Sequence, residues 1–253
     1  MQQKSLTPEK IKIFKNLIGS VSTETDFNKI LQEEKHGSNN KVLVIAAHPD
    51  DELLGCGATF RKYVLSGNEV YCLILGEGAV MHGISSEDLK QQTREAGKII
   101  GFKKIYFHGF PDNRLDTVPL LDVTRIVERH IKEIQPDLLY VHHFDDLNID
   151  HRITFQACMT ACRPGCSTVK EIYAFETPSS TEWAYDGGFK PNVFNDISDA
   201  LEDKLKAMEC YKTEIRDYPH PRSARAMVAR AEYWGQVAGV EYAEAFELVR
   251  CVK

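Results

Sequence analysis

The residues of this chain best suited to chemistry stand together in the segment His48-Pro49-Asp50-Asp51-Glu52. His48 and Asp51 offer a nitrogen and an oxygen ligand three residues apart, which suits zinc or a similar divalent metal. Asp50 is then left as a carboxylate that need not bind the metal. A hydrolytic metal site requires such a group, because a base beside the metal must take a proton from water. The alternative is that the acidic residues only cap a helix and complement its dipole.

A second group of ligand-type residues lies in the segment VHHFDDLNIDH, from Val141 to His151. It contains two adjacent histidines, several carboxylates and a final histidine. Either segment alone could be an ordinary polar loop. Because both segments follow short apolar runs, their occurrence in one chain favours a shared metal site.

Two short apolar runs precede these segments and predict the elements that position them. Val42–Ala47 and Leu138–Val141 have the length and composition of buried strands, and each ends abruptly in polar residues. The residues after Glu52 fit a helix with one buried face. Both polar segments therefore fall at the C-terminal ends of strands, where open α/β sheets bind their ligands.

The motif AHPDDE after a buried strand, followed later by an Asp-His pair, resembles the LmbE-like family, also called the PIG-L deacetylases. The resemblance covers roughly Lys41 to the C-terminus. Members of this family are metal-dependent N-deacetylases that act mostly on N-acetylglucosamine derivatives. The resemblance implies that His48, Asp51 and His151 bind the metal and that Asp50 is the general base.

One position departs from the family pattern. Many members have a histidine three residues before the last metal ligand, assigned to stabilising or protonating the intermediate, whereas this chain has Asn148. Asparagine can donate a hydrogen bond to an oxyanion, but it cannot deliver a proton. Asp150 is expected to contact a metal ligand without binding the metal itself. The candidates for delivering the proton to the leaving amine are Asp50, His142, His143 and His220.

The segments DLNIDH, GFPDNRLDT, ETPSSTEW and PHPRS resemble bacterial sugar-processing members of the family. We therefore expect a zinc-dependent N-deacetylase of an N-acetylated amino sugar, with Fe²⁺ as another possible metal. The sugar is expected to be nucleotide-linked or part of a cell-surface glycan pathway. Asp112 and Asn113 are expected to bind the substrate, and His220 and Arg222 to recognise an anionic group on it. The alternatives are a glycoside of a low-molecular-weight thiol pathway, or a non-catalytic metal- or sugar-binding protein.

Strand and helix patterns alternate from Lys41 onward, which predicts an α/β fold: a Rossmann-like, three-layer αβα arrangement with a mostly parallel sheet. The later strand candidates are Glu69–Leu75, Lys104–Phe107, Asp137–Val141 and Glu171–Phe175. The helix candidates are 86–100, 119–134, 199–211 and 223–239. Residues 1–40 contain two amphipathic segments and are expected to form an N-terminal helical extension, with residues 41–253 forming the deacetylase domain.

The composition narrows the class of protein. The 253 residues carry a formal net charge of -6 without a cluster of Lys and Arg, so we expect no nucleic-acid partner. No apolar run approaches the roughly 20 residues that span a bilayer. Seven cysteines without a secretory signal indicate a reducing compartment, and we expect a cytoplasmic enzyme. We expect the amphipathic N-terminal segments to pack on the domain or against a second subunit, which would make a homo-oligomer, rather than to bind a membrane surface.

Overall fold

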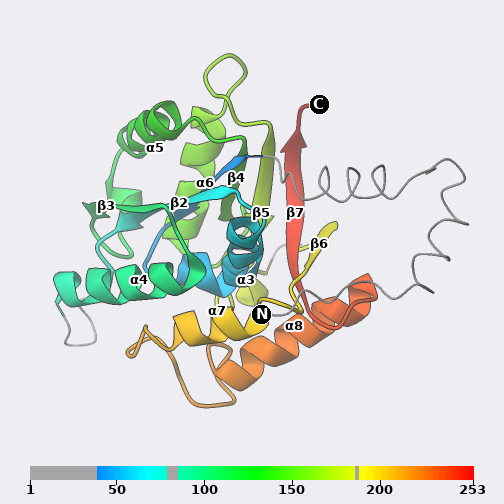
Figure 1. Cartoon of the computed structure of the whole chain (residues 1–253). Helices are drawn as coiled ribbons and strands as arrows, with labels where there is room; N and C mark the ends of the chain where they lie inside the picture. Colours follow the sequence, from blue (N-terminus) through cyan, green and yellow to red (C-terminus); the bar gives the residue numbers. More distant parts are fainter. Residues whose placement is uncertain (1–38, 79–84, 186–187) are drawn as a thin grey trace, which may run out of the picture. The chain divides into compact units, whose positions relative to one another are not determined.

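A computed structural model of the chain describes residues 39–78, 85–185 and 188–253 (Figure 1). The strands are β1 (Lys41–Ala46), β2 (Glu69–Gly76), β3 (Lys104–Phe110), β4 (Leu138–His142), β5 (Glu171–Phe175), β6 (Val193–Asp196) and β7 (Ala243–Cys251). The α-helices are α3 (Asp51–Leu65), α4 (Ser86–Ile100), α5 (Leu120–Ile134), α6 (Ile149–Ala161), α7 (Leu201–Met208) and α8 (Ala224–Ala238). Two short 3-10 helices, η2 and η3, span Leu115–Thr117 and Thr181–Trp183. The expected helical extension, residues 1–40, lies outside the described residues except for its last two.

The strands described here form one seven-stranded sheet in the order β3-β2-β1-β4-β5-β7-β6. The strands from β3 to β5 in this order are parallel, whereas β7 pairs antiparallel with β5 and β6 antiparallel with β7. The predicted mostly parallel α/β fold is thus confirmed. β6 and β7 were not expected from the sequence. Glu244 and Glu247 interrupt the apolar pattern of β7 but are used in contacts inside the protein.

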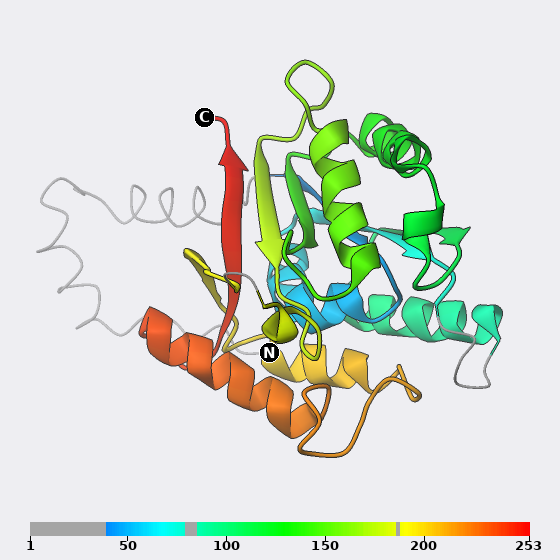
Figure 2. The ribbon, with the colours of Figure 1, turned by 180° about the vertical axis from the view of Figure 1, so that it is seen from behind.

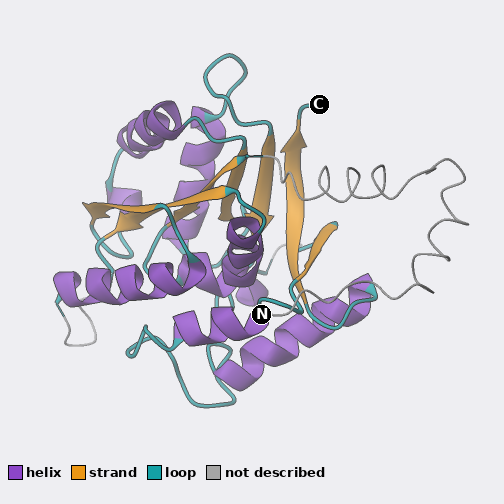
Figure 3. Ribbon diagram, in the orientation of Figure 1, coloured by secondary structure: helices purple, strands orange, loops and turns teal. Residues whose placement is uncertain are grey.

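Helices cover both faces of the sheet and so make three layers (Figures 2 and 3). Alternate residues of β1 point to opposite faces, as the pleat requires. Val42 and Val44 pack in the core formed with α3, α4, α7 and α8, whereas Leu43 and Ile45 pack in the core formed with α5 and α6. None of the helices within the described ranges is long and apolar enough to cross a membrane.

The chain order places β1 and β4 side by side at the centre of the sheet. From β1 the chain runs outward to β2 and β3, and then returns to place β4 on the other side of β1. Such a reversal leaves a crevice at the C-terminal ends of the two strands, which is the usual ligand site of open α/β sheets. The residues after Ala46 and those after Val141 therefore meet. His151 does not lie at the strand end itself but in the first turn of α6.

Candidate functional site

Asp50 lies at the junction of β1 and α3, where the backbone takes an unusual conformation. Its φ is 100°, a region that residues with a Cβ rarely adopt. The turn is held by the Asp50 N–H, which donates to Glu52 Oε2 (3.0 Å), and by the Tyr211 hydroxyl, which donates to Glu52 Oε1 (2.6 Å). Within the described residues, the Asp50 side chain makes no helix-capping hydrogen bond. The capping alternative therefore does not account for its carboxylate.

His48, Asp51 and His151 come together as the sequence predicted. One ligand atom from each can be chosen such that all lie within 4.8 Å of one another. Asp51 Oδ2 is 3.2 Å from His48 Nδ1 and 3.3 Å from His151 Nε2. Three groups of the types preferred by zinc and related metals thus converge from β1, α3 and α6.

Asp51 provides a test of whether a metal fits this triad. Its side chain is 1% exposed, and its Oδ1 atom has no hydrogen-bond partner among the residues described. A buried carboxylate oxygen without a donor is costly, so such groups are usually paired or bind a metal. The donor set and the unpartnered oxygen both fit a divalent cation.

Carboxylates surround His48. Its Nε2 atom is 3.1 Å from Asp150 Oδ2 and 3.4 Å from Asp112 Oδ1. Burial lowers the pKa of His48, but the hydrogen bonds to Asp150 and Asp51 outweigh it and raise the pKa to about 10. Asp150 is itself held in place, because its Oδ1 atom accepts a hydrogen bond from Leu115 N (2.9 Å). The local field attracts positive charge.

A second carboxylate, Asp146, supports His151 from the side opposite Asp51. Asp146 Oδ1 lies 3.0 Å from His151 Nδ1, while the other ring nitrogen of His151, Nε2, lies beside Asp51. The hydroxyls of Ser180 and Thr181 both donate to Asp146. Burial raises the pKa of Asp146, but His151 and these hydroxyls lower it to about 2. Asp146 therefore stays ionised and can hold the imidazole of His151 in one orientation.

The carboxylate of Asp50 bonds to a residue outside the triad, Arg222. Its Oδ2 atom accepts a hydrogen bond from Arg222 Nη1 (2.8 Å), and the same nitrogen is 3.2 Å from Glu214 Oε2. Arg222 Nε donates to Ser179 Oγ (3.0 Å). Burial raises the pKa of Asp50 well above its usual value, although the charge of Arg222 opposes this shift. Arg222 is thus bound to the candidate base, where the sequence predicted a contact with the substrate.

Of the histidines considered as proton donors, His142 lies against the triad, with Nε2 3.5 Å from Asp51 Oδ2. His142 and His143 are fully buried, and His142 stacks on His151 with ring centroids 3.8 Å apart. His142 Nε2 accepts a hydrogen bond from Ala47 N (2.9 Å), and its Nδ1 atom lies 3.1 Å from Thr177 Oγ1. Burial lowers the pKa of His142 well below its usual value. His220 Nδ1 accepts a hydrogen bond from Arg222 N (3.1 Å).

A cavity of about 370 Å³ opens over the triad. Its lining residues in the described part of the chain are His48, Asp50, Asp112, Asn113, Leu147, Asn148, His151, Ser179, Ser180, Glu214 and Arg222. Asn148 Nδ2 donates to Asn113 Oδ1 (3.0 Å), and Asn113 Nδ2 donates to Asp112 Oδ2 (3.0 Å). Asp112, Asn113 and Asn148 thus form a hydrogen-bonded row of polar groups in the lining, of a kind that suits sugar hydroxyls.

The cavity unites most of the predicted site residues but not all. Asp51 and Asp150 are buried beside it, in contact with His48. The three histidines proposed as proton donors are not among the described residues that line it, which leaves Asp50 as the lining candidate. Two residues without a predicted role, Asp146 and Glu214, take part in the site. Asp146 belongs to the polar segment after β4, whereas nothing in the local sequence distinguishes Glu214.

Comparisons with known proteins identify relatives of this chain among the deacetylases. The family model of the GlcNAc-PI de-N-acetylases, PIG-L, matches residues 43–162. An uncharacterized deacetylase of Escherichia coli K12, YaiS, is 32% identical over 74% of this chain and 100% of its own length. The diacetylchitobiose deacetylase of Thermococcus kodakarensis is 28% identical over 95% of this chain and 94% of its own.

A solved structure shares the fold. The N,N'-diacetylchitobiose deacetylase of Pyrococcus horikoshii, crystallised with an inhibitor, superposes with a TM-score of 0.68. The match covers 91% of this chain and 94% of the other at 24% sequence identity. The arrangement of strands and helices is therefore one that is known from a solved structure.

Proposed function

The chain belongs to the PIG-L, or LmbE-like, family of deacetylases, and we propose that it is a metal-dependent hydrolase that removes the acetyl group from an N-acetylated amino sugar. The observation that carries the proposal is the position of Asp50. Its buried carboxylate lines the same cavity as His48 and His151 but is not part of the triad. A ligand set with a spare carboxylate beside it is what amide hydrolysis at a metal requires.

His48, Asp51 and His151 would hold the metal, which we take to be Zn²⁺, with Fe²⁺ as the alternative. When bound, such an ion supplies Lewis acidity, which polarises the acetamide carbonyl and lowers the pKa of water. Asp50 accepts a proton from water as the water oxygen adds to the carbonyl carbon. Asp50 then returns the proton to the nitrogen as the C–N bond breaks, which gives the free amine and acetate. The amide of Asn148 can donate to the oxyanion.

The charges of the cavity favour an uncharged sugar. Three of its lining residues are acidic, Asp50, Asp112 and Glu214, and Arg222 Nη1 and Nε already bind protein groups. A sugar nucleotide would bring a pyrophosphate to this acidic surface. We therefore place the substrate among neutral N-acetylglucosamine glycans, in keeping with the relative from Thermococcus kodakarensis.

Acetate release from a panel of substrates tests the proposal. The panel contains free N-acetylglucosamine, N,N'-diacetylchitobiose, uridine diphosphate N-acetylglucosamine and an N-acetylglucosaminide with an acidic aglycone. We expect the Zn²⁺-loaded protein to give its highest kcat/KM with a neutral sugar. A preference for the nucleotide or the acidic glycoside would overturn the substrate class and leave the deacetylase in place. Sugar binding without acetate release from any compound would instead favour the non-catalytic alternative.

A further inference from the structure

Helix α3 is broken one turn after the metal ligand Asp51. Cys56 has φ -149° and ψ 17°, which are not helical values. In a regular helix the N–H of Ala58 would bond to the carbonyl of Leu54 across this position. Side chains from distant parts of the chain contact both groups: Glu244 Oε1 accepts from Ala58 N (3.2 Å), and Lys204 Nζ donates to Leu54 O (2.8 Å). A side chain inserted into the backbone ladder is a recognised cause of a helix kink.

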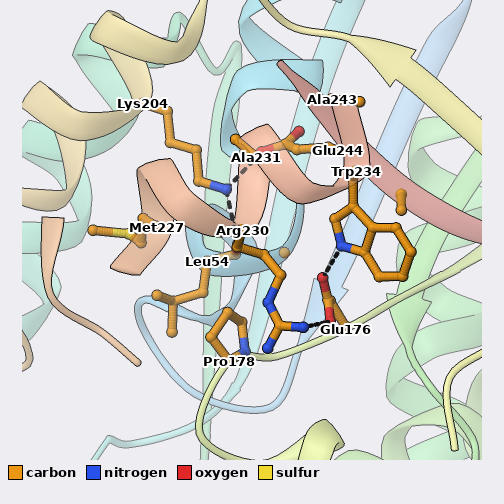
Figure 4. A pocket seen from close by; sticks show the side chains of 12 residues that line it. Leu54, Glu176, Pro178, Lys204, Met227, Arg230, Ala231, Trp234, Ala243 and Glu244 are labelled. Atoms are coloured by element: carbon orange, nitrogen blue, oxygen red, sulfur yellow. Dashed lines mark hydrogen bonds and ion pairs between the residues drawn. The ribbon is translucent and has the colours of Figure 1, made fainter. Parts of the chain in front are cut away.

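Lys204 and Glu244 form an ion pair at this break (Figure 4). Lys204 Nζ is 2.7 Å from Glu244 Oε1, and Glu244 Oε2 accepts a second hydrogen bond, from Thr59 N (2.7 Å). Both residues are buried, with 6% and 5% of their surface exposed. A buried ion pair is often no more stabilising than apolar residues in the same place. Its location on the break therefore points to a role in shaping α3.

The part of α3 before the break approaches the end of β5 closely at Gly55. A Cβ atom on Gly55 would lie 2.3 Å from Phe175 Cδ2 and 2.9 Å from the carbonyl oxygen of Glu176. The backbone of α3 is thus pressed against the last residue of β5 and the start of the following loop. Ser180 and Thr181 in that loop support Asp146, the partner of His151. The turn that carries Asp51 and the loop that supports His151 are therefore packed together.

We propose that Lys204 and Glu244 are positioning residues of the metal centre. By holding the break in α3 open, they let its first turn dock on β5, which places Asp51 opposite His48 and His151. Neither residue is among those that line the cavity over the triad. The inference rests on the proposed function only in requiring that the triad binds a metal. It assigns a function in the centre to residues about 150 to 190 positions away in the chain, as their contacts with Leu54 and Ala58 show.

The affinity for Zn²⁺, measured by competition with a chelator, tests this role. The double variant Lys204→Met with Glu244→Gln removes both charges, so that no unpaired ion is left buried. We expect it to weaken Zn²⁺ binding about tenfold or more, the range typical of outer-shell partners. We also expect kcat to fall while KM for a neutral sugar changes little. The single variant Lys204→Arg can still donate to both Leu54 and Glu244, so it should keep most of the wild-type affinity for Zn²⁺.

A control pair exists between α3 and α7. Arg61 Nε is 2.6 Å from Asp203 Oδ2, and this partly exposed pair also joins α3 to α7, but beyond the break. Arg61→Met with Asp203→Asn should leave the affinity for Zn²⁺ at the wild-type value. Circular dichroism and thermal unfolding identify variants that are folded at the temperature of the titration. If the double variant is unfolded, Glu244→Gln alone, which keeps one acceptor oxygen, replaces it.

Wild-type affinity in a folded Lys204→Met/Glu244→Gln protein, or equal weakening in the control pair, would overturn the positioning role. Neither result bears on acetate release, so the deacetylase would stand. A wild-type protein that binds no Zn²⁺ would overturn the metal centre and this inference together.

Discussion

Asp50 is buried like Asp51 and Asp150, but its backbone conformation and its partner set it apart from them. Its φ of 100° is strained, and its carboxylate bonds to Arg222 rather than to the triad. Strained residues are retained where the surrounding structure fixes them, and here Glu52 and Arg222 do so. The orientation of the proposed base thus depends on a residue from the loop before α8.

Replacing Arg222 separates two possible roles of this residue. If Arg222 orients Asp50, Arg222→Ala should lower kcat by roughly ten- to a hundredfold, since misplacing a catalytic group by about 1 Å has such an effect. Zn²⁺ content and KM for a neutral sugar should change little. Arg222→Lys keeps the charge, but its single nitrogen cannot replace both Nη1, which bonds to Asp50, and Nε, which bonds to Ser179. The rate of this variant should therefore be intermediate. Steady-state kinetics beside metal analysis provides the measurement.

The role predicted from the sequence gives a different kinetic result. If Arg222 recognises an anionic group of the substrate, Arg222→Ala would raise KM for a sugar nucleotide and leave kcat unchanged. That outcome would contradict the role of Arg222 in orienting Asp50.

At the scale of elements, the positioning that we propose for Asp51 depends on the close approach of α3 to the end of β5. Gly55 permits this contact, because a larger residue would collide with Phe175 and with the backbone of Glu176. We expect Gly55→Ala to lower the free energy of unfolding by about 2 kcal/mol, as overpacking of a core does. It should also weaken Zn²⁺ binding, because the first turn of α3 must move away from β5.

Gly57→Ala is the control for this prediction. A Cβ at Gly57 would lie 3.3 Å from Lys204 Cγ and 3.4 Å from Leu53 Cδ2, contacts that small shifts can relieve. Chemical denaturation of the two variants, each with and without Zn²⁺, compares them directly. Equal stability and equal metal affinity for Gly55→Ala and Gly57→Ala would show that the close approach to β5 is not required.

Elements with a clear hydrophobic pattern could be predicted from the sequence. β1, β2, β4 and β5 are buried apolar runs, and α4 and α5 have one apolar face, so their positions were predicted to within one or two residues. β6 has only four residues, and the glutamates of β7 hide its pattern. The break in α3 could not be predicted, because its cause lies in Lys204 and Glu244.

On the scale of the whole molecule, the centre is assembled by the order of strands rather than by neighbouring residues. The resemblance to the family implied the set His48, Asp51 and His151, and the pairing of β1 with β4 explains why the three side chains meet. Arg222 and Glu214 reach the cavity from the segment between α7 and α8, whereas Lys204 of α7 and Glu244 of β7 contact α3. Local patterns indicate which residues form a strand or helix, but they do not indicate which distant side chains those elements bring together. For that reason the hydrogen bond of Arg222 to Asp50 and the contacts of Asp146 and Glu214 were not predicted.

The central claim is that Asp50 acts as the base beside a metal held by His48, Asp51 and His151. Metal content and acetate release, measured on the same preparations of wild type, Asp51→Ala and Asp50→Asn, test it most directly. We expect Asp51→Ala to lose both the metal and the activity. Asp50→Asn should keep the metal and lose acetate release by at least about 100-fold, the contribution usual for a general base. An Asp50→Asn protein that is filled with metal and less than roughly tenfold slower than wild type would contradict the claim.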